Sequence, residues 1–340
     1  MNHDKNKERI ANRAVEIMRV QDKSLATQKS YRGYILRYYD FCLTLPREWT
    51  PEQKFERFLT HLAVECDLSS SACRGAFFAV LFLYNHVEVR EVDLRKVNAM
   101  RSKRPVQIRK APSEEDVRAL LEDVLDVSGY PTRLVVKMLY GSGLRVSEPI
   151  ALRRKEVRLE RRELYILNGK GGKDRVVRLP EAVVEQISEQ MIVAETVWRR
   201  DKENGVPVAL PNQLGRKYPE YRFAKEWSWV FPLHTTSIHP ITGEVVRYHM
   251  LPSAVQKAVK ESRRRLDIQV VAHELRHGYA THVLDHGGKL KALQQALGHS
   301  KLETTGGYCH ADALSVESPL DAFPNVIQFS PQKTEIAALA

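Results

Sequence analysis

The chain has 340 residues, 43% of them hydrophobic and 28% charged, a composition typical of a globular protein with room for two domains. Its formal net charge of +11 favours a polyanionic partner, most often nucleic acid. Because no run of 18 apolar residues occurs and the first ten residues are polar, we expect no membrane span, no signal peptide and a cytoplasmic location. The four cysteines form no CxxC pair, which argues against a zinc site or a disulfide framework.

The N-terminal segment reads as a helical domain over residues 1–98. Thr50 and Pro51 form a helix start, with the proline in the first turn, and Ser69 is a candidate cap further on. Apolar residues recur at helical spacing in four stretches, 11–20, 25–45, 51–65 and 69–87.

Residues 99–112 are predicted to be a linker between two domains. They contain Pro105 and Pro112 and lack helical periodicity. Residues 95–110 include no acidic residue, so a path along phosphates is expected. The candidate DNA-contacting residues here are Arg95, Lys96, Arg101, Lys103, Arg104, Arg109 and Lys110.

A second, mixed α/β domain is predicted over residues 113–316. Ser113 begins a capping-box pattern, and a helix follows that ends at the glycines of GSG. Three strand-like runs come next, VRL, ELYIL and RVVRLP, and the turn-rich NGKGGKD joins the last two as a hairpin with Lys170 at its tip. Helices return in three segments, at 251–266, 272–286 and 289–297, the last ending at Gly298.

Two segments do not follow these patterns. Residues from about 200 to 250 are rich in Pro, Tyr, Trp and His, with weak periodicity, and are too aromatic for a disordered linker. Residues 317–340 read as a C-terminal docking segment, with SPLDAF as a short helix, followed by a weakly ordered tail.

Six residues spread over the second domain are those that phosphodiester chemistry requires. Arginines donate to two phosphate oxygens at once and keep their charge, and a tyrosine can hold a phosphate covalently. Each residue alone has an ordinary structural explanation, and it is their joint order that indicates a site. They are Arg145 in GSGLR, Lys170 in NGKGGKDR, His273 and Arg276 in HELRH, His299 in ALGHS and Tyr308 in TTGGYCH.

Two other motifs compete for the same residues. HELRH fits the HExxH zinc signature, with His273 and His277 one helical turn apart and Glu303 or His299 as a third ligand. The arginine inside that motif would repel a dication, so we expect no metal and no cofactor. NGKGGKDR lacks the GxxxxGK[ST] frame of a phosphate-binding loop and lies between strands.

The order of these six residues resembles the tyrosine recombinase family over nearly the whole chain, and most of all the integron integrases. The resemblance implies a mainly α fold with a small β-sheet, in which a SAM-like core-binding domain and a catalytic domain close as a C-shaped clamp on DNA. It implies that Tyr308 is the nucleophile, Lys170 the general acid and His273 the base. Arg145, Arg276 and His299 would stabilise the phosphate. It also implies a protein that is monomeric in solution, tetrameric on DNA and located at the nucleoid when bound.

The aromatic segment resembles an insertion that, in integron integrases, recognises extrahelical bases of a folded single-stranded hairpin. Four residues match that role, Trp227, Pro240, Tyr248 and His249. Trp227 and Trp229 are equally well explained as core residues.

Departures from the family pattern leave alternatives open. Gly306 and Gly307 precede the tyrosine where bulkier residues are usual, and Glu274 places a carboxylate beside the phosphate site. A generic phage or Xer-like recombinase, or a degenerate relative that binds DNA without cutting, therefore stands as an alternative.

Overall fold

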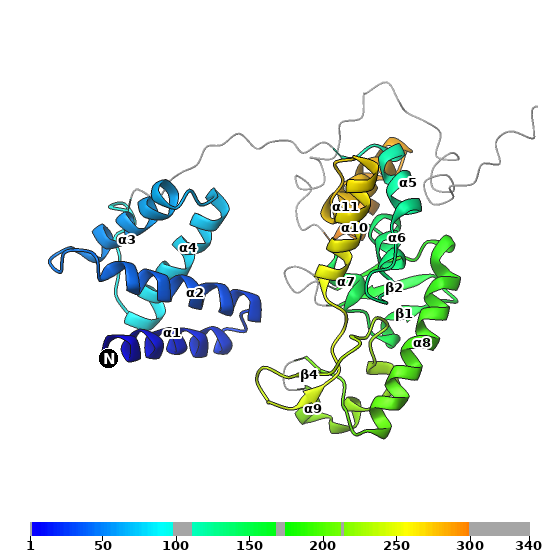
Figure 1. Ribbon diagram of the computed structural model, residues 1–340, viewed down its shortest axis with the longest axis horizontal. Coiled ribbons are helices and arrows are strands. Elements are labelled where there is room, and N and C mark those ends of the chain that lie inside the picture. Colours follow the sequence, from blue (N-terminus) through cyan, green and yellow to red (C-terminus); the bar gives the residue numbers. More distant parts are fainter. Residues whose placement is uncertain (1, 98–110, 168–173, 212–213, 299–340) are drawn as a thin grey trace, which may run out of the picture. The chain divides into compact units, whose positions relative to one another are not determined.

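The computed structural model describes residues 2–97, 111–167, 174–211 and 214–298, and its two compact units are Met1–Gln107 and Ile108–Ala340 (Figure 1). The boundary between these units falls inside the predicted linker. In the part of the chain that is described, no helix is both long and apolar enough to cross a membrane.

The first unit is helical, as predicted, and is built around aromatic side chains. Its elements are α1 (Asn2–Val20), α2 (Leu25–Cys42), α3 (Pro51–Thr60), the π-helical turn η1 (His61–Glu65), α4 (Ser70–Phe82) and a second π-helical turn, η2 (Leu83–Glu88). Phe55 and Phe58 are fully buried against Tyr38, whose hydroxyl lies 2.7 Å from that of Tyr84. These contacts join α2, α3 and η2 into one core.

The predicted helix starts in this unit are confirmed, with one error in length. Thr50 and Ser69 each accept a hydrogen bond from the backbone two or three residues into the following helix. Helix α1, however, begins at Asn2 instead of residue 11. Its first half has no apolar periodicity, and ion pairs hold it instead, among them Lys7 with Asp40 of α2.

The second unit combines helices with a small sheet. Its first elements are α5 (Glu114–Asp123), α6 (Thr132–Gly141), α7 (Ser147–Ile150), the 3₁₀ turn η3 (Arg154–Glu156), β1 (Val157–Arg158), β2 (Glu163–Ile166) and β3 (Arg175–Arg178). The strands pair antiparallel in the order β1-β2-β3, with Ile166 opposite Arg175. The three strands and the β2–β3 hairpin are thus confirmed.

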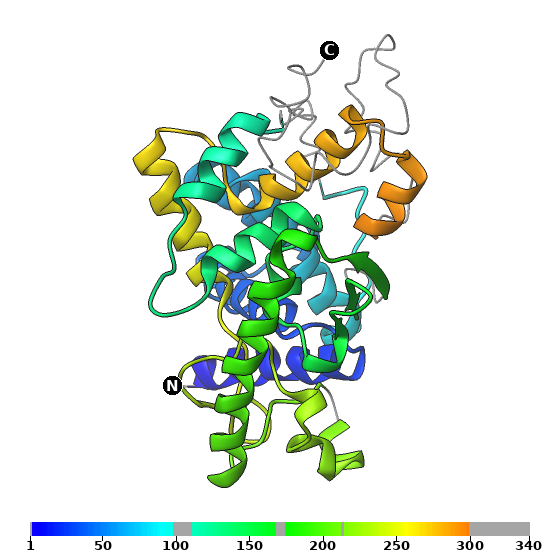
Figure 2. The same ribbon diagram turned by 90° about the vertical axis from the view of Figure 1, so that its right-hand side faces the viewer.

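The remaining elements include the aromatic segment and the three closing helices. They are η4 (Glu181–Val183), α8 (Val184–Glu203), α9 (Leu214–Lys217), η5 (Pro219–Arg222), η6 (Lys225–Trp227), β4 (Ser237–Ile238), β5 (Val245–Val246), α10 (Pro252–Leu266), α11 (Ala272–Asp285) and α12 (Leu290–Leu297). Helix α6 is apolar on most sides and packs against α5, α10 and α11. Figures 1 and 2 show these helices at one end of the unit and the β4–β5 hairpin at the other, with α8 reaching between them.

Candidate active site

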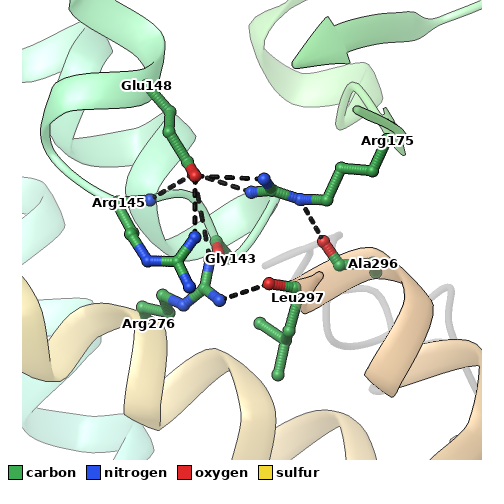
Figure 3. A network of polar contacts seen from close by, with 7 residues as sticks. All are labelled: Gly143, Arg145, Glu148, Arg175, Arg276, Ala296 and Leu297. Atoms are coloured by element: carbon green, nitrogen blue, oxygen red, sulfur yellow. Dashed lines mark hydrogen bonds and ion pairs between the residues drawn. The ribbon is translucent and has the colours of Figure 1, made fainter. Parts of the chain in front are cut away.

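One buried carboxylate, that of Glu148 in α7, holds arginines from three separate elements (Figure 3). Arg145, in the turn before α7, donates to it through its backbone N–H and its Nη1, at 2.7 and 2.9 Å. Arg175, the first residue of β3, donates through Nη1 and Nη2 at 3.0 and 2.7 Å. Arg276 of α11 brings Nη1 within 3.8 Å of Oε2. Glu148 therefore fixes the mutual positions of three cations.

Backbone carbonyls orient the two more deeply buried guanidinium groups. Arg175 donates from Nε to the carbonyl of Ala296 at 2.7 Å. Arg276 donates from Nη1 to the carbonyl of Gly143 at 2.7 Å and from Nη2 to that of Leu297 at 2.5 Å. Because the carbonyls at the end of a helix carry partial negative charge, the end of α12 is a favourable place for both cations. The chain that leaves α12 consequently starts beside these arginines.

The glycines of GSG have a structural role in this arrangement. Gly143 has a φ of +60°, and a Cβ at this position would lie 2.4 Å from Cδ1 of the Tyr279 ring. Only glycine can both adopt this positive φ and leave room for the Tyr279 ring without displacing α11. The turn thus brings the carbonyl of Gly143 to Arg276 and starts the segment that presents Arg145.

The charges of the cluster are not balanced. Burial by itself raises the pKa of the Glu148 carboxyl, but hydrogen bonds from Arg175 and Arg145 outweigh that effect and hold the pKa below its ordinary value. Glu148 is therefore ionised, and the cluster carries three positive charges against one negative charge. The side chain of Arg145 is 23% exposed, whereas those of Arg175 and Arg276 are 7% and 3% exposed. Arg145 is the member most open to a ligand from solvent.

Helix α11 carries two of the predicted catalytic residues, His273 and Arg276, three positions apart on one side of the helix. His273 is exposed and Arg276 is buried, so the helix carries the histidine outward from the arginine cluster. The imidazole of His273 meets that of His277 edge to face, at 4.9 Å between ring centroids. Glu274, which the sequence placed as a negative charge near the site, accepts from the backbone N–H of Val271 at 2.9 Å. It caps the start of α11, and its carboxylate is engaged there.

Three predicted catalytic residues, Lys170, His299 and Tyr308, lie outside the described residues. Lys170 belongs to the connection between β2 and β3. His299 directly follows Gly298, which ends α12 with a φ of +65° as the sequence predicted. The roles of all three remain predictions.

Of the predicted linker contacts, only Arg95 and Lys96 are described. Both are exposed, and Arg95 pairs with Asp93 at 3.1 Å. The other five, Arg101, Lys103, Arg104, Arg109 and Lys110, lie outside the described residues.

In the aromatic segment, Trp227 is half-buried and already has partners. Its ring stacks on that of Tyr221, with 5.3 Å between centroids, and the ammonium of Lys155 lies 3.1 Å from its centroid. Trp229 is a core residue, 7% exposed, and its ring lies 3.6 Å from the guanidinium carbon of Arg153. A base that stacks on Trp227 would have to share or displace its present neighbours.

The other three residues predicted to contact bases lie around the β4–β5 hairpin. Pro240 is exposed in the connection between the two strands. Tyr248 is half-buried and stacks on His239. His249 contacts Trp229 edge to face, and burial lowers the pKa of its imidazole, which favours the neutral ring.

Sequence reasoning missed Glu148 and Arg175, which organise the site, and Arg153, which anchors the aromatic segment. Glu148 follows Arg145 by three residues, and that spacing of opposite charges at a helix start was a usable signal. Arg153 is buried, which lowers its pKa to about 10, and it donates to the carbonyls of Trp227 and Ala209 at 2.6 and 2.8 Å. For Arg153 and Arg175 no local pattern indicated burial.

The zinc alternative finds no support within the described ranges. No group of three His, Cys, Asp or Glu side chains there is placed to hold a metal ion. The third ligands considered for His273 and His277 were Glu303 and His299, and both lie outside the residues described.

Comparisons with known proteins point in one direction. Residues 112–314 match the Phage integrase family, and residues 10–94 match its N-terminal SAM-like domain. The chain is 34% identical over 319 residues to an integrase/recombinase from Escherichia coli, covering 91% of this chain and 92% of the relative. It is 28% identical over 302 residues to the tyrosine recombinase XerA of Thermococcus kodakarensis, covering 85% of this chain and 86% of the relative.

Solved structures show the same fold. The XerH site-specific recombinase, in a post-cleavage complex with its difH substrate, has a TM-score of 0.56 at 20% identity, covering 85% of this chain and 78% of XerH. The Tn1549 transposon integrase, in complex with transposon end DNA, has a TM-score of 0.53 at 15% identity, covering 90% and 96%. The mainly helical fold with a small sheet is confirmed. The chain belongs to the phage integrase family, the tyrosine recombinases, and is a DNA strand transferase.

Proposed function

We propose that this protein is a site-specific recombinase of the integron integrase type, which cuts and rejoins DNA through a 3′-phosphotyrosyl intermediate. The observation that carries the proposal is the arginine cluster on Glu148, with His273 on the helix that supplies Arg276. An excess of fixed positive charge at the surface end of a buried network is what the transition state of phosphoryl transfer requires.

The proposed roles follow the resemblance to the tyrosine recombinases, and for Arg145 also its exposure. Arg145 and Arg276 contact the phosphate oxygens, with His299 as a further donor. All three nitrogens of the Arg175 guanidinium already donate to Glu148 or Ala296, so Arg175 positions the other two arginines. His273 accepts the proton of Tyr308, and Lys170 protonates the leaving 5′-oxygen. The phosphotyrosyl bond conserves the energy of the broken phosphodiester, which allows rejoining without ATP.

The proposed partner is DNA, with both units contributing to its binding. The net charge of +11 and the exposed Arg95 and Lys96 support this. Recombination would take place in a homotetramer on DNA in the cytoplasm, at the nucleoid, assembled from monomers in solution with residues 317–340 docking on a neighbour.

The integron subtype is supported by the aromatic segment. This segment folds with its own pair of strands. It is connected to the rest of the unit by Arg153, which donates to the carbonyl of Ala209, and by the buried ion pair of Arg247 with Asp201 of α8, at 2.6 Å. A segment that presents the half-buried Trp227 and the exposed Pro240 suits contact with bases outside a duplex. The proposed substrates are therefore folded single-stranded cassette sites together with a duplex site.

Trapping the covalent intermediate tests the proposal. The full-length protein is mixed with end-labelled folded single-stranded hairpins and nicked duplexes in the presence of a chelator, and run on a denaturing gel. A protein-sized labelled band that disappears in Tyr308→Phe supports the nucleophile, and a band that depends on the hairpin substrate supports the integron subtype.

Two other outcomes favour the alternatives. Adducts on duplex sites alone would favour a Xer-like or generic phage recombinase, in line with the relative named XerA. Salt-sensitive binding without an adduct on any substrate would favour a degenerate relative that holds DNA without cutting it.

A further inference from the structure

A chain of polar contacts in the first unit, remote in sequence from the arginine cluster, ends on a thiol. Arg57 of α3 pairs with Glu65 Oε1 at 2.6 Å, and Glu65 Oε2 lies 2.8 Å from Nδ1 of His61. Nε2 of His61 lies 3.4 Å from the sulfur of Cys66. From α2, Arg37 donates through Nη2 to the same sulfur at 3.0 Å. The order carboxylate, imidazole, sulfur is that of an activated nucleophile.

A π-helical turn creates this arrangement. In an α-helix, residues five apart point in directions about 140° different, so His61 and Cys66 would not meet. Here the backbone N–H of Cys66 donates to the carbonyl of His61, five residues back, at 3.0 Å. Turns of this kind are rare in proteins, and those that occur often lie at functional sites. The ring of Phe41 stacks on His61 at 4.5 Å and fixes its orientation.

The hydrogen-bond partners of His61 determine its tautomer. Hydrogen bonds from His61 and then Arg57 lower the pKa of Glu65, so its carboxylate is ionised and Nδ1 of His61 carries the proton. Nε2 then faces the sulfur, where it can accept the thiol proton. The guanidinium of Arg37 donates to an anionic sulfur better than to a neutral thiol.

The other two described cysteines have the opposite surroundings. Burial is the main cause that raises the pKa of both Cys42 and Cys73. Cys73 is 8% exposed and donates to the carbonyl of Leu68. Cys66 is half-buried and lies beside the exposed Arg37, so a small reagent from solvent can approach its sulfur.

We propose that Cys66 is a reactive thiol, a modification site at which hydroperoxides oxidise the sulfur with His61, Glu65 and Arg37 as activating residues. The thiolate attacks one peroxide oxygen, so that an S–O bond forms while the O–O bond breaks. The departing group is hydroxide from hydrogen peroxide or alkoxide from an organic hydroperoxide. It takes from Nε2 of His61 the proton that came from the thiol, and leaves as water or an alcohol. The sulfur is oxidised to a sulfenic acid and the peroxide is reduced.

Quantitative labelling of the full-length protein tests this assignment. Hydrogen peroxide is added in the presence of dimedone, which traps sulfenic acids, and each cysteine peptide is quantified separately by mass spectrometry. We expect Cys66 to be labelled about tenfold faster than Cys42 and Cys73, in keeping with the reactivity of activated thiols. Reading the peptides one by one keeps Cys309 apart from this comparison.

Matched variants separate activation from simple exposure. Arg37→Gln and His61→Asn should each slow the labelling of Cys66 by about three- to fivefold, the size expected for one exposed charge interaction, and Arg37→Lys should restore part of the rate. Arg32→Gln removes a half-buried arginine of the same helix that pairs with Glu8 instead, and should leave the rate unchanged. Equal labelling of Cys66 and Cys42, or an Arg37→Gln rate equal to that of Arg32→Gln, overturns the proposal. If His61→Asn fails to fold, the two arginine variants decide.

Discussion

Removing the charge of Glu148 tests whether this carboxylate holds the catalytic unit together. Glu148→Gln keeps the shape of the side chain but replaces one acceptor oxygen with a donor nitrogen that must face an arginine. Arg175 and Arg276 would remain buried, at 7% and 3% exposure, with most of their charge uncompensated. Breaking a buried ion pair in this way costs about 3–5 kcal/mol. Because glutamine keeps one acceptor, we expect a loss near the lower limit, about 3 kcal/mol.

Urea unfolding followed by tryptophan fluorescence measures this loss, since three of the four tryptophans, Trp198, Trp227 and Trp229, lie in the second unit. With a slope of about 2 kcal/mol per molar urea, the midpoint should fall by about 1.5 M. Glu181→Gln is the matched control, because Glu181 pairs with Arg162 at the surface, where the two side chains are 67% and 35% exposed. That pair is worth about 0–1 kcal/mol. Equal midpoint shifts in the two variants would refute the view that Glu148 organises the site.

Three further predictions follow from particular contacts. Because the pKa of Glu148 is lowered on folding, its carboxylate stabilises the folded protein at pH values above its unfolded pKa, about 4.3, and this stabilisation is lost as the pH falls through the folded pKa. The unfolding free energy of Glu148→Gln should therefore depend less on pH below about 4.5 than that of the wild type, and parallel acid titrations would contradict this. Gly143→Ala should lower the free energy of unfolding in urea by about 2–4 kcal/mol, because of its positive φ and the contact of the new Cβ with Tyr279. Gly205→Ala, at a φ of +68° but with open space around it, should lower it by about 1 kcal/mol. Similar losses in the two variants would show that the contact with Tyr279 is harmless. Trp227→Ala should weaken binding of a folded hairpin with an extrahelical base by about 1–3 kcal/mol and leave duplex binding unchanged in a gel-shift titration, and an equal loss on both substrates would exclude base stacking.

Local patterns predicted the elements well because local physics determines them. Thr50 and Ser113 cap helices through their own side chains, and Gly298 ends α12 because its φ of +65° strains other residues. The β2–β3 hairpin follows from turn-rich residues between alternating runs. Such signals lie within a few residues, so one sequence is enough to read them.

The centre of the site was not predictable in the same way. Arg175 meets Glu148 across 27 positions of sequence, and its burial depends on how β3 packs beside α7 and α12. In the sequence it is one basic residue in a basic stretch. The resemblance to a family supplied the residues proposed to contact the phosphate, but the carboxylate that holds the arginines is evident only from their contacts.

A carboxylate inside a proposed phosphate site looks unfavourable, yet its charge suits the proposed reaction. Three guanidinium groups around Glu148 leave an excess of two positive charges. A phosphodiester carries one negative charge, whereas the pentavalent arrangement during transfer carries about two. The excess therefore matches the transition state better than the ground state, which is the condition for catalysis.

DNA binding and DNA cutting should respond differently to the loss of the Glu148 charge. In Glu148→Gln the excess rises to three positive charges while the arginines lose their common anchor. We expect DNA binding to be at least as tight as in the wild type, because charge attraction to phosphate grows. Formation of the Tyr308 adduct should nevertheless slow by about tenfold or more, because the donors no longer point at fixed positions. A variant that lost binding and adduct formation in equal proportion would show instead that Glu148 serves folding alone.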